Sequence, residues 1–330
     1  MVAAGCTAFW CAHLPTPLLC GGLVGALRVA LTSRARLALP RWVFLAAQGV
    51  VGATVGAAVD WETLGSLGSA WIAVVVVSAL TLVISVGAGQ LLRLHHVSAV
   101  TASFASIAGG ASGMTALAHD LGADDRVVTV IQYLRVLVVL FSMPAVVALV
   151  FHAHESSRSG PGGGGTADVL FTVLVVALGV TLGRLARLPS PAILGALVAA
   201  VLLRLLPTFD GAFVPSWLQA VGFLGIGVQV GLRFTLDSLK AIGRMLPTAM
   251  VSIALTVVGC AALGWALTEL TAVSSLDAYL ATTPGGLYAV LATASSTGGD
   301  VTFVTGVQML RLLLVLLLAP ALARLLRPRD

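Results

Sequence analysis

An internal duplication constrains the fold of this chain more than any other feature. Residues 109–144 align without gaps with residues 285–320, and 15 of the 36 aligned positions are identical. A self-similar block of this length indicates that one structural unit occurs twice. The identities include polar residues that an apolar composition does not favour: Asp124 with Asp300, Gln132 with Gln308, and Arg135 with Arg311.

The composition places this duplicated unit in a membrane. The 330 residues are 58% hydrophobic and only 9% charged, whereas a soluble domain has about a quarter of its residues charged. Several apolar runs, including residues 70–89 and 311–326, approach the roughly 20 residues that a helix needs to cross a bilayer. We therefore expect an all-α polytopic membrane protein with about 9 to 11 membrane segments.

The likeness between the two halves extends upstream of the aligned block, so the duplication divides the whole chain. We expect a first membrane repeat over residues 1–153, a Gly/Ser-rich linker over residues 154–167 and a second membrane repeat over residues 168–330. Compared with the second repeat, the first is expected to have a shortened N-terminal helix. Arginine is preferred over lysine and Ala, Gly and Val are abundant, which is typical of a high-GC bacterium. We therefore expect a multi-pass protein of the bacterial plasma membrane.

Two segments, residues 95–118 and 276–296, are too rich in Gly, Ala, Ser and Thr to face lipid. Their glycine pairs leave backbone groups that hydrocarbon cannot satisfy, so we expect re-entrant hairpins or broken helices buried in protein. Re-entrant segments place the arginine-rich loops, such as residues 28–41 and 233–244, in the cytoplasm. The two repeats are then inverted, which is the organisation of many secondary transporters with a binding site at mid-membrane.

The repeated Gln-x-x-Arg pairs are the first candidate site. Gln132 and Arg135 are three residues apart and therefore share a helix face, as do Gln308 and Arg311. Two interpretations remain open for the arginines. They line a central polar cavity and bind an anionic substrate, or they pair with Asp300 or with backbone carbonyls of the opposite Gly-Gly segment. Asp124 and Asp300 are expected to have a structural or coupling role.

The glycine-broken turns are the second candidate. Glycine lets the backbone approach a ligand closely, and a helix that begins after the turn offers free N–H groups to an anion. Close packing of small residues is the alternative explanation. Both features together predict a substrate-binding set made of Gly109, Gly110, Thr282, Thr283, Pro284, Gly285, Gly286, Gln132, Arg135, Gln308 and Arg311.

The repeated block, with its Gly-Gly pair, Gly-x-Asp and Gln-x-Leu-Arg followed by an apolar helix and proline, resembles the AbrB-like membrane protein family. Members have a duplicated membrane AbrB domain and have been labelled transition-state regulators and ammonia monooxygenases. The resemblance covers nearly the whole chain and implies its fold and membrane location. The family tends to have a Glu-Met pair after the glycines, where this chain has Gly113-Met114 and Ala289-Val290. This absence argues against a glutamate-dependent proton mechanism.

These features predict a secondary transporter or permease of a small solute, with an anion as one option. The alternative, which the family label implies, is a membrane protein that regulates gene expression indirectly. Direct binding to nucleic acid is not expected, because no soluble domain of useful size is present. We expect no enzymatic activity, cofactor or metal, because the membrane segments have no metal-ligand cluster and the chain has no GxSxG, Walker or HExxH motif. The expected partners are the lipid bilayer and a small-molecule solute, with a homo-oligomer left open.

Overall fold

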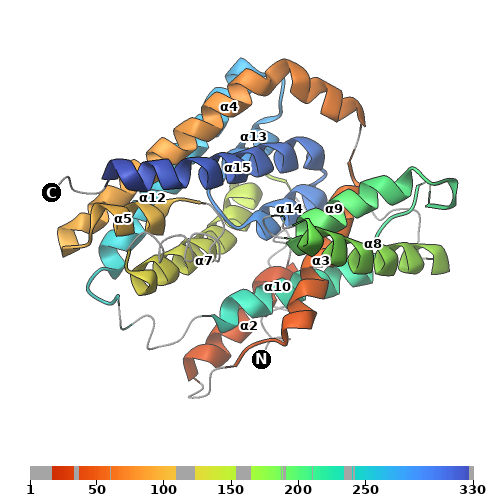
Figure 1. The fold of residues 1–330 in the computed structure, drawn as a ribbon, viewed down its shortest axis with the longest axis horizontal. Helices are drawn as coiled ribbons and strands as arrows, with labels where there is room; N and C mark the ends of the chain where they lie inside the picture. The colour runs from red at the N-terminus through yellow and green to blue at the C-terminus, as the bar shows by residue number, and fades with distance from the viewer. Residues whose placement is uncertain are drawn as a thin grey trace. The chain divides into compact units, whose positions relative to one another are not determined.

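The computed structural model is all-helical over the residues that it describes, which are 17–32, 37–59, 61–108, 123–153, 165–186, 188, 191–209, 211–233, 240 and 242–326. This confirms the predicted fold class, and Figure 1 shows the helices in chain order. Their bounds are α2 Pro17–Thr32, α3 Arg41–Ala57, α4 Trp61–Gly89, η1 Gln90–His95, α5 Ala99–Ser106, α7 Asp125–Leu149, α8 Thr166–Leu185, α9 Pro191–Arg204, η2 Pro207–Phe209, α10 Ser216–Leu232, α12 Leu246–Leu270, α13 Ser275–Thr282, α14 Leu287–Thr297 and α15 Val301–Leu326.

Several helices have the length and composition of membrane spans, as expected for a polytopic membrane protein. Four are long and apolar enough to cross a bilayer: Trp71–His95, Arg126–Leu149, Thr166–Leu185 and Leu246–Leu270. Four shorter helices are also apolar: Pro17–Thr32, Pro191–Leu203, Ser216–Leu232 and Val301–Val315. The number of membrane segments stays a prediction.

The duplication in the sequence is a duplication of helices. Going along the chain, α2 corresponds to α9, α3 to α10, α4 to α12, α5 to α13 and α7 to α15. The equivalent helices α4 and α12 are both long, with 29 and 25 residues. The broken helices α5 and α13 also agree, with 8 residues each. Local structure therefore follows the repeat closely.

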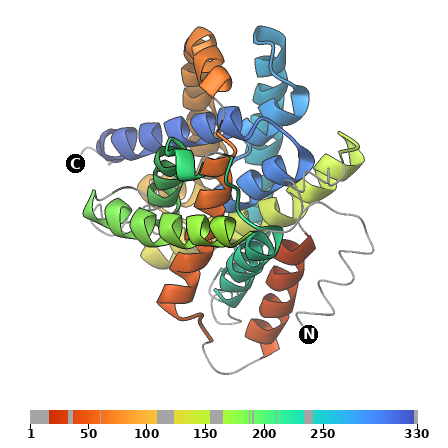
Figure 2. The ribbon, with the colours of Figure 1, turned by 90° about the vertical axis from the view of Figure 1, so that its right-hand side faces the viewer.

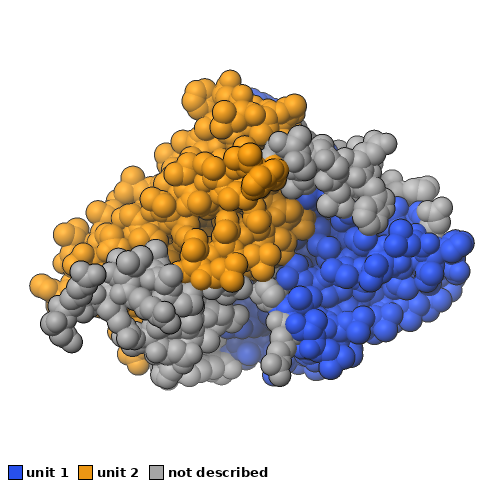
Figure 3. Space-filling model, turned by 45° about the horizontal axis from the view of Figure 1, so that its top comes forward, with its two compact units in different colours: residues 1–64, 143–235, 288–302 blue, residues 65–142, 236–287, 303–330 orange. Residues whose placement is uncertain are grey.

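The chain forms two compact units, coloured separately in Figure 3. Unit 1 contains residues 1–64, 143–235 and 288–302. Unit 2 contains residues 65–142, 236–287 and 303–330. Each unit therefore draws equivalent helices from both repeats, so a single repeat is not a compact domain by itself.

Glycines in unit 1 bring α2 against α10 and α9 against α3. A Cβ at Gly227 would lie 2.1 Å from the carbonyl oxygen of Leu19, and one at Gly52 would lie 2.4 Å from that of Ile193. These two contacts occupy equivalent places in the duplication. Figure 2 shows the first pair, α2 in dark red beside α10 in teal. Such close backbone approach is the usual role of small residues between membrane helices.

The same contacts fix the direction of each pair. One turn further along, Gly231 meets Leu23 of α2, and Gly56 meets Leu197 of α9. Residue numbers rise together along both helices of each pair. Helix α2 is therefore parallel to α10, and α9 is parallel to α3.

Helices α3 and α10 run in opposite directions. A Cβ at Gly222 would meet Val50, and a Cβ at Gly225 would meet Ala47, so numbers rise on one helix as they fall on the other. Since α2 follows the direction of α10, and α9 that of α3, α2 and α9 are antiparallel. This is the relation that inverted repeats require.

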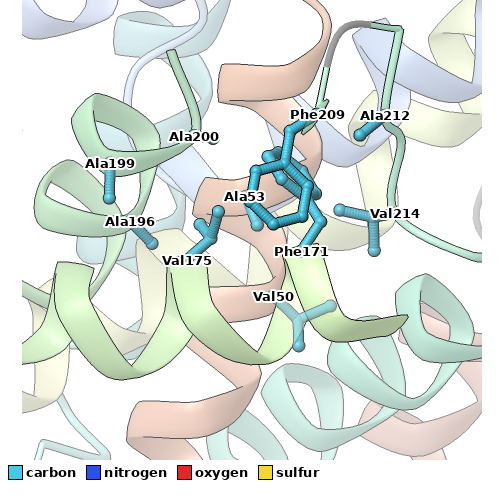
Figure 4. Packing of buried hydrophobic residues seen from close by; sticks show 10 residues of the cluster. All are labelled: Val50, Ala53, Phe171, Val175, Ala196, Ala199, Ala200, Phe209, Ala212 and Val214. Carbon is cyan, nitrogen blue, oxygen red and sulfur yellow. The ribbon is translucent and has the colours of Figure 1, made fainter. Parts of the chain in front are cut away.

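The centre of unit 1 is packed with apolar side chains from α3, α8 and α9 and from the segment around η2 (Figure 4). The rings of Phe171 and Phe209 are tilted against each other, with their centroids 5.6 Å apart. The cluster consists of Val50, Ala53, Phe171, Val175, Ala196, Ala199, Ala200, Phe209, Ala212 and Val214. It stabilises unit 1, and the repeated arginines lie in unit 2.

Candidate functional site: two capped broken helices

Unit 2 contains the two broken helices, α5 and α13, and both begin in the same way. The hydroxyl of Ser98 accepts a hydrogen bond from the backbone N–H of Thr101 at 3.1 Å, and Ser274 does the same for Asp277 at 3.1 Å. These are serine N-caps, which satisfy a free N–H group of the first turn. Eight residues of helix rise about 12 Å, against about 30 Å of bilayer hydrocarbon, so neither helix crosses it alone.

The chain after α13 is shaped to end the helix. Pro284 has no N–H group to donate to the preceding turn, and Thr283 is already outside helical geometry, with φ −53° and ψ 126°. Gly285 and Gly286 follow with φ angles of 103° and 71°, which L side chains rarely adopt. Helix α14 begins directly afterwards, at Leu287. Of the predicted site residues, Gly109 and Gly110 lie outside the described residues.

The start of α7 lies beside the first turn of α5. The backbone N–H of Asp124, just before α7, donates to the hydroxyl of Thr101 in the first turn of α5, at 3.0 Å. Asp124, 23 positions after Thr101, therefore lies at the start of α5. Residues 109–122 lie outside the described part of the chain, so the re-entrant path of residues 95–118 stays a prediction.

A glutamine and an arginine of α7 cap the C-terminal end of α5. The side-chain amide of Gln132 donates to the carbonyl oxygens of Phe104 and Ile107, at 2.7 and 2.8 Å. Nη1 of Arg135 donates to Ser106 O at 2.7 Å, and Nη2 donates to Oε1 of Gln132 at 2.6 Å. The last carbonyls of a helix have no partner within it, so this pair supplies the missing donors.

Helix α15 caps α13 with the equivalent pair. The amide of Gln308 donates to Leu280 O at 2.9 Å, to Ala281 O at 3.1 Å and to Thr283 O at 3.2 Å. Nη1 of Arg311 donates to Thr283 O at 2.7 Å, and Nη2 donates to Gln308 Oε1 at 2.5 Å. We call each arrangement a Gln-Arg clamp, made of Gln132 with Arg135 or of Gln308 with Arg311.

The predicted polar residues have different roles: the glutamines and arginines form the clamps, and the aspartates do not. Each clamp bonds the broken helix of its own repeat, and Gly109 and Gly110, the opposite Gly-Gly pair for Arg311, lie outside the described residues. Asp124 lies away from the clamp, because its Oδ1 accepts from the N–H groups of Arg126 and Val127, at 3.0 and 3.2 Å, and so caps the start of α7. Asp300 holds the equivalent position before α15.

Both guanidinium groups are buried without a carboxylate partner among the described residues. Arg135 is 3% exposed and Arg311 is 6% exposed. The C-terminal end of a helix offsets about half an elementary charge. Each clamp is therefore left with roughly half a positive charge, or about one for the two clamps together. In addition, Nε of both arginines is buried and has no hydrogen-bond partner.

Each arginine also faces the other repeat. A Cβ at Gly285 would lie 3.0 Å from Nε of Arg135, so the turn of the second repeat packs on the arginine of the first. Arg311 lines a crevice that includes Ala108 of the first repeat, Pro284 and Val315. In this conformation the crevice is too narrow to hold a water molecule.

Equivalent residues meet at this crevice. Ala108 and Pro284 correspond in the duplication, and both line it. Nearby, a Cβ at Gly259 of α12 would lie 2.8 Å from Ile84, its equivalent on α4. Equivalent positions contact each other where a two-fold axis passes. The crevice therefore lies near a local pseudo-two-fold axis of unit 2, with the two clamps related across it.

Three hydroxyl residues of α4 belong near this site but were not predicted from the sequence. Thr81 and Ser85 line the crevice, and Ser78 is buried on the same helix face. Their spacing of three and four residues in an otherwise apolar helix is the signal that could have identified them. Among the described residues, no group of three or more His, Cys, Asp or Glu side chains comes together. The site is thus built from guanidinium groups, hydroxyls and backbone.

The comparisons with known proteins agree with the predicted family. A family model described as "Transition state regulatory protein AbrB" matches residues 18–327. The chain is 33% identical over 325 residues to "Putative regulator AbrB" of Escherichia coli (strain K12), covering 96% of this chain and 91% of that protein. It is 26% identical over 307 residues to "Uncharacterized protein YhjN" of Bacillus subtilis (strain 168), covering 87% of this chain and 79% of that protein. The chain belongs to the AbrB family of membrane proteins.

Proposed function

We propose that this chain is a secondary transporter of a small solute in a bacterial plasma membrane, with the clamped crevice of unit 2 as its binding site. The observation that carries the proposal is the pair of broken helices, α5 and α13, whose ends lie at one crevice near a local two-fold axis. Transporters built from inverted repeats bind their solutes where discontinuous helices of the two repeats meet.

The clamps give this proposal a physical basis. A helix that ends inside a membrane exposes carbonyl groups to which lipid offers no hydrogen bond. Each such buried, unpaired carbonyl costs several kcal/mol, on the order of the cost of moving it from water into an apolar medium. Two such ends in one unit are retained here, each with a dedicated glutamine and arginine. A continuous helix would need neither device. Binding of a solute between the ends of α5 and α13 would explain why these helices are broken, whereas insertion into the membrane alone does not require a break.

The competing function is indirect regulation of gene expression, and the name of the Escherichia coli relative calls that protein a regulator. In that case the same crevice would sense a metabolite without moving it. The two functions differ in net flux, since a transporter moves solute through a sealed membrane and a sensor does not.

The test is uptake by the purified full-length protein in sealed liposomes. The liposomes are incubated with a defined mixture of amino acids, amines, sugars, monocarboxylates and dicarboxylates, and their contents are identified by mass spectrometry. We expect enrichment of one chemical class over liposomes that contain heat-denatured protein. If no component of the mixture is enriched, while the protein is folded by circular dichroism, transport of these solutes is refuted.

A further inference from the structure

We propose that the clamped crevice binds the carboxylate group of a small monocarboxylate, held between the Nε–H donors of Arg135 and Arg311. The inference rests on the proposed site and names its ligand class. It starts from the charge that the structure leaves uncompensated and from the donors that it leaves unused.

The charge favours an anion with a single negative charge. The clamps use Nη1 and Nη2 of each arginine to cap a helix end, which offsets about half of each guanidinium charge. The remaining positive charge of about one elementary unit lies in buried surroundings, where an unpaired charge is unfavourable. A monoanion neutralises it, whereas a dianion leaves an excess negative charge and a neutral solute leaves the positive one.

The unused donors favour a carboxylate among monoanions. Nε of Arg135 and Nε of Arg311 are both buried and without a hydrogen-bond partner. The two residues are equivalent in the duplication: Arg311 lines the crevice, and Arg135 packs against Gly285, the neighbour of the crevice residue Pro284. A carboxylate has two equivalent oxygens in one plane, so each arginine can donate to one of them. Planar guanidinium groups match carboxylates in this way better than they match a spherical halide.

The crevice lining favours a short ligand. Around Arg311 the surface consists of small hydroxyl, methyl and proline groups, including Thr81, Ser85 and Val315. The crevice must open to admit a ligand, since in this conformation it cannot hold a water molecule.

Binding to the purified full-length protein tests this inference. Acetate, propionate and lactate are compared with acetamide, malonate and chloride at equal ionic strength, by thermal shift and by calorimetric titration. We expect a saturable shift with the three monocarboxylates. We also expect at least a tenfold weaker effect with the neutral amide, the dicarboxylate and the halide. An equal response to acetate and acetamide, or to acetate and chloride, would overturn the proposal.

Two variants separate the site from the fold. Val315→Phe fills the crevice, and Leu313→Phe places the same ring on the exposed side of the same helix, where Leu313 is 49% exposed. We expect the first to weaken acetate binding at least tenfold and the second to leave it unchanged. Arg311→Lys keeps the charge but removes the planar Nε–H donor, and should also weaken binding at least tenfold in folded protein. Wild-type affinity in Val315→Phe or Arg311→Lys would refute the assignment.

The outcomes distinguish this inference from the proposed function. Monocarboxylate binding without uptake into liposomes supports the site and refutes transport. Uptake of an amine or a sugar without monocarboxylate binding supports transport and refutes the carboxylate site.

Discussion

Replacement of Gln308 by leucine tests whether the clamp stabilises the fold by capping a helix. The side-chain amide of Gln308 donates to three carbonyl oxygens, and Arg311 can serve only the one at Thr283 once the amide is gone. The carbonyl oxygen of Leu280 cannot accept a helical hydrogen bond from the residue four positions later, because that residue is Pro284 and has no N–H group. Gln308→Leu therefore leaves the carbonyls of Leu280 and Ala281 without this donor.

The magnitude follows from these two groups. A buried polar group left without a partner costs about 1–3 kcal/mol, so two carbonyls cost roughly 2–6 kcal/mol. Whole proteins are stable by about 5–15 kcal/mol, which makes this a large fraction of the total. With about 2–4 °C of melting temperature per kcal/mol for chains of this order of size, we expect Gln308→Leu to melt at least about 4 °C lower.

The assay is thermal unfolding of the full-length protein in one detergent, followed by intrinsic tryptophan fluorescence. The equivalent substitution Gln132→Leu should lower the melting temperature by a similar amount, because it also leaves two carbonyls, those of Phe104 and Ile107, without this donor. Leu313→Ala on the exposed side of α15 is the control and should have little effect. A melting temperature of Gln308→Leu equal to that of the control would show that the carbonyls have another partner, and the capping argument would fail.

Three further predictions concern the turn, the helix contacts and the orientation of the repeats. Gly285→Ala should destabilise the protein by about 1–3 kcal/mol in thermal unfolding, because φ is 103° and the new Cβ would press on Arg135. Gly227→Ala should destabilise it by a similar amount of about 1–3 kcal/mol, because its Cβ would lie 2.1 Å from a backbone oxygen. Gly87→Ala, with nothing within 4 Å of the added Cβ, is the control for both and should be neutral or stabilising. Trp42→Cys and Trp217→Cys place a cysteine at the starts of α3 and α10. In oriented vesicles, a membrane-impermeant maleimide should label these two cysteines from opposite sides of the membrane. Labelling of both from the same side would contradict the inversion of the repeats.

The sequence predicts the helices well because each is a long apolar run with a polar boundary. The apolar run over residues 70–89 lies in α4, Trp61–Gly89, and the run over residues 311–326 lies in α15, Val301–Leu326. The broken segments were also predictable, because glycine and proline in mid-segment exclude a continuous lipid-facing helix. What the hydropathy pattern does not contain is the pairing of helices. That pairing depends on glycines such as Gly52 and Gly227, whose contacts lie far away along the chain.

The partners of the candidate site were less predictable than its residues. Gln132 and Arg135 were identified because both copies contain them, but repetition does not say what a side chain bonds. A substrate and a helix end present similar oxygen acceptors to a guanidinium group. In the structure the amide of Gln132 is fully engaged, with Nε2 donating to two carbonyls and Oε1 accepting from Arg135. Gln132 therefore positions Arg135, and in the proposed site it influences the ligand through that arginine.

The duplication also explains why the residues of the proposed ligand site are the residues that cap the helices. In an inverted repeat, every group of residues that lies away from the pseudo-two-fold axis occurs twice. Each broken helix therefore has its own Gln-Arg clamp. Only groups near the axis of unit 2, such as Ala108 and Pro284, face their own equivalents. A single ligand that contacts both repeats equally must lie at that axis, and the proposed site therefore uses the two Nε atoms that the clamps leave without a hydrogen-bond partner, those of Arg135 and Arg311. In this proposal the arginines satisfy the helix ends with one edge and bind the solute with the other.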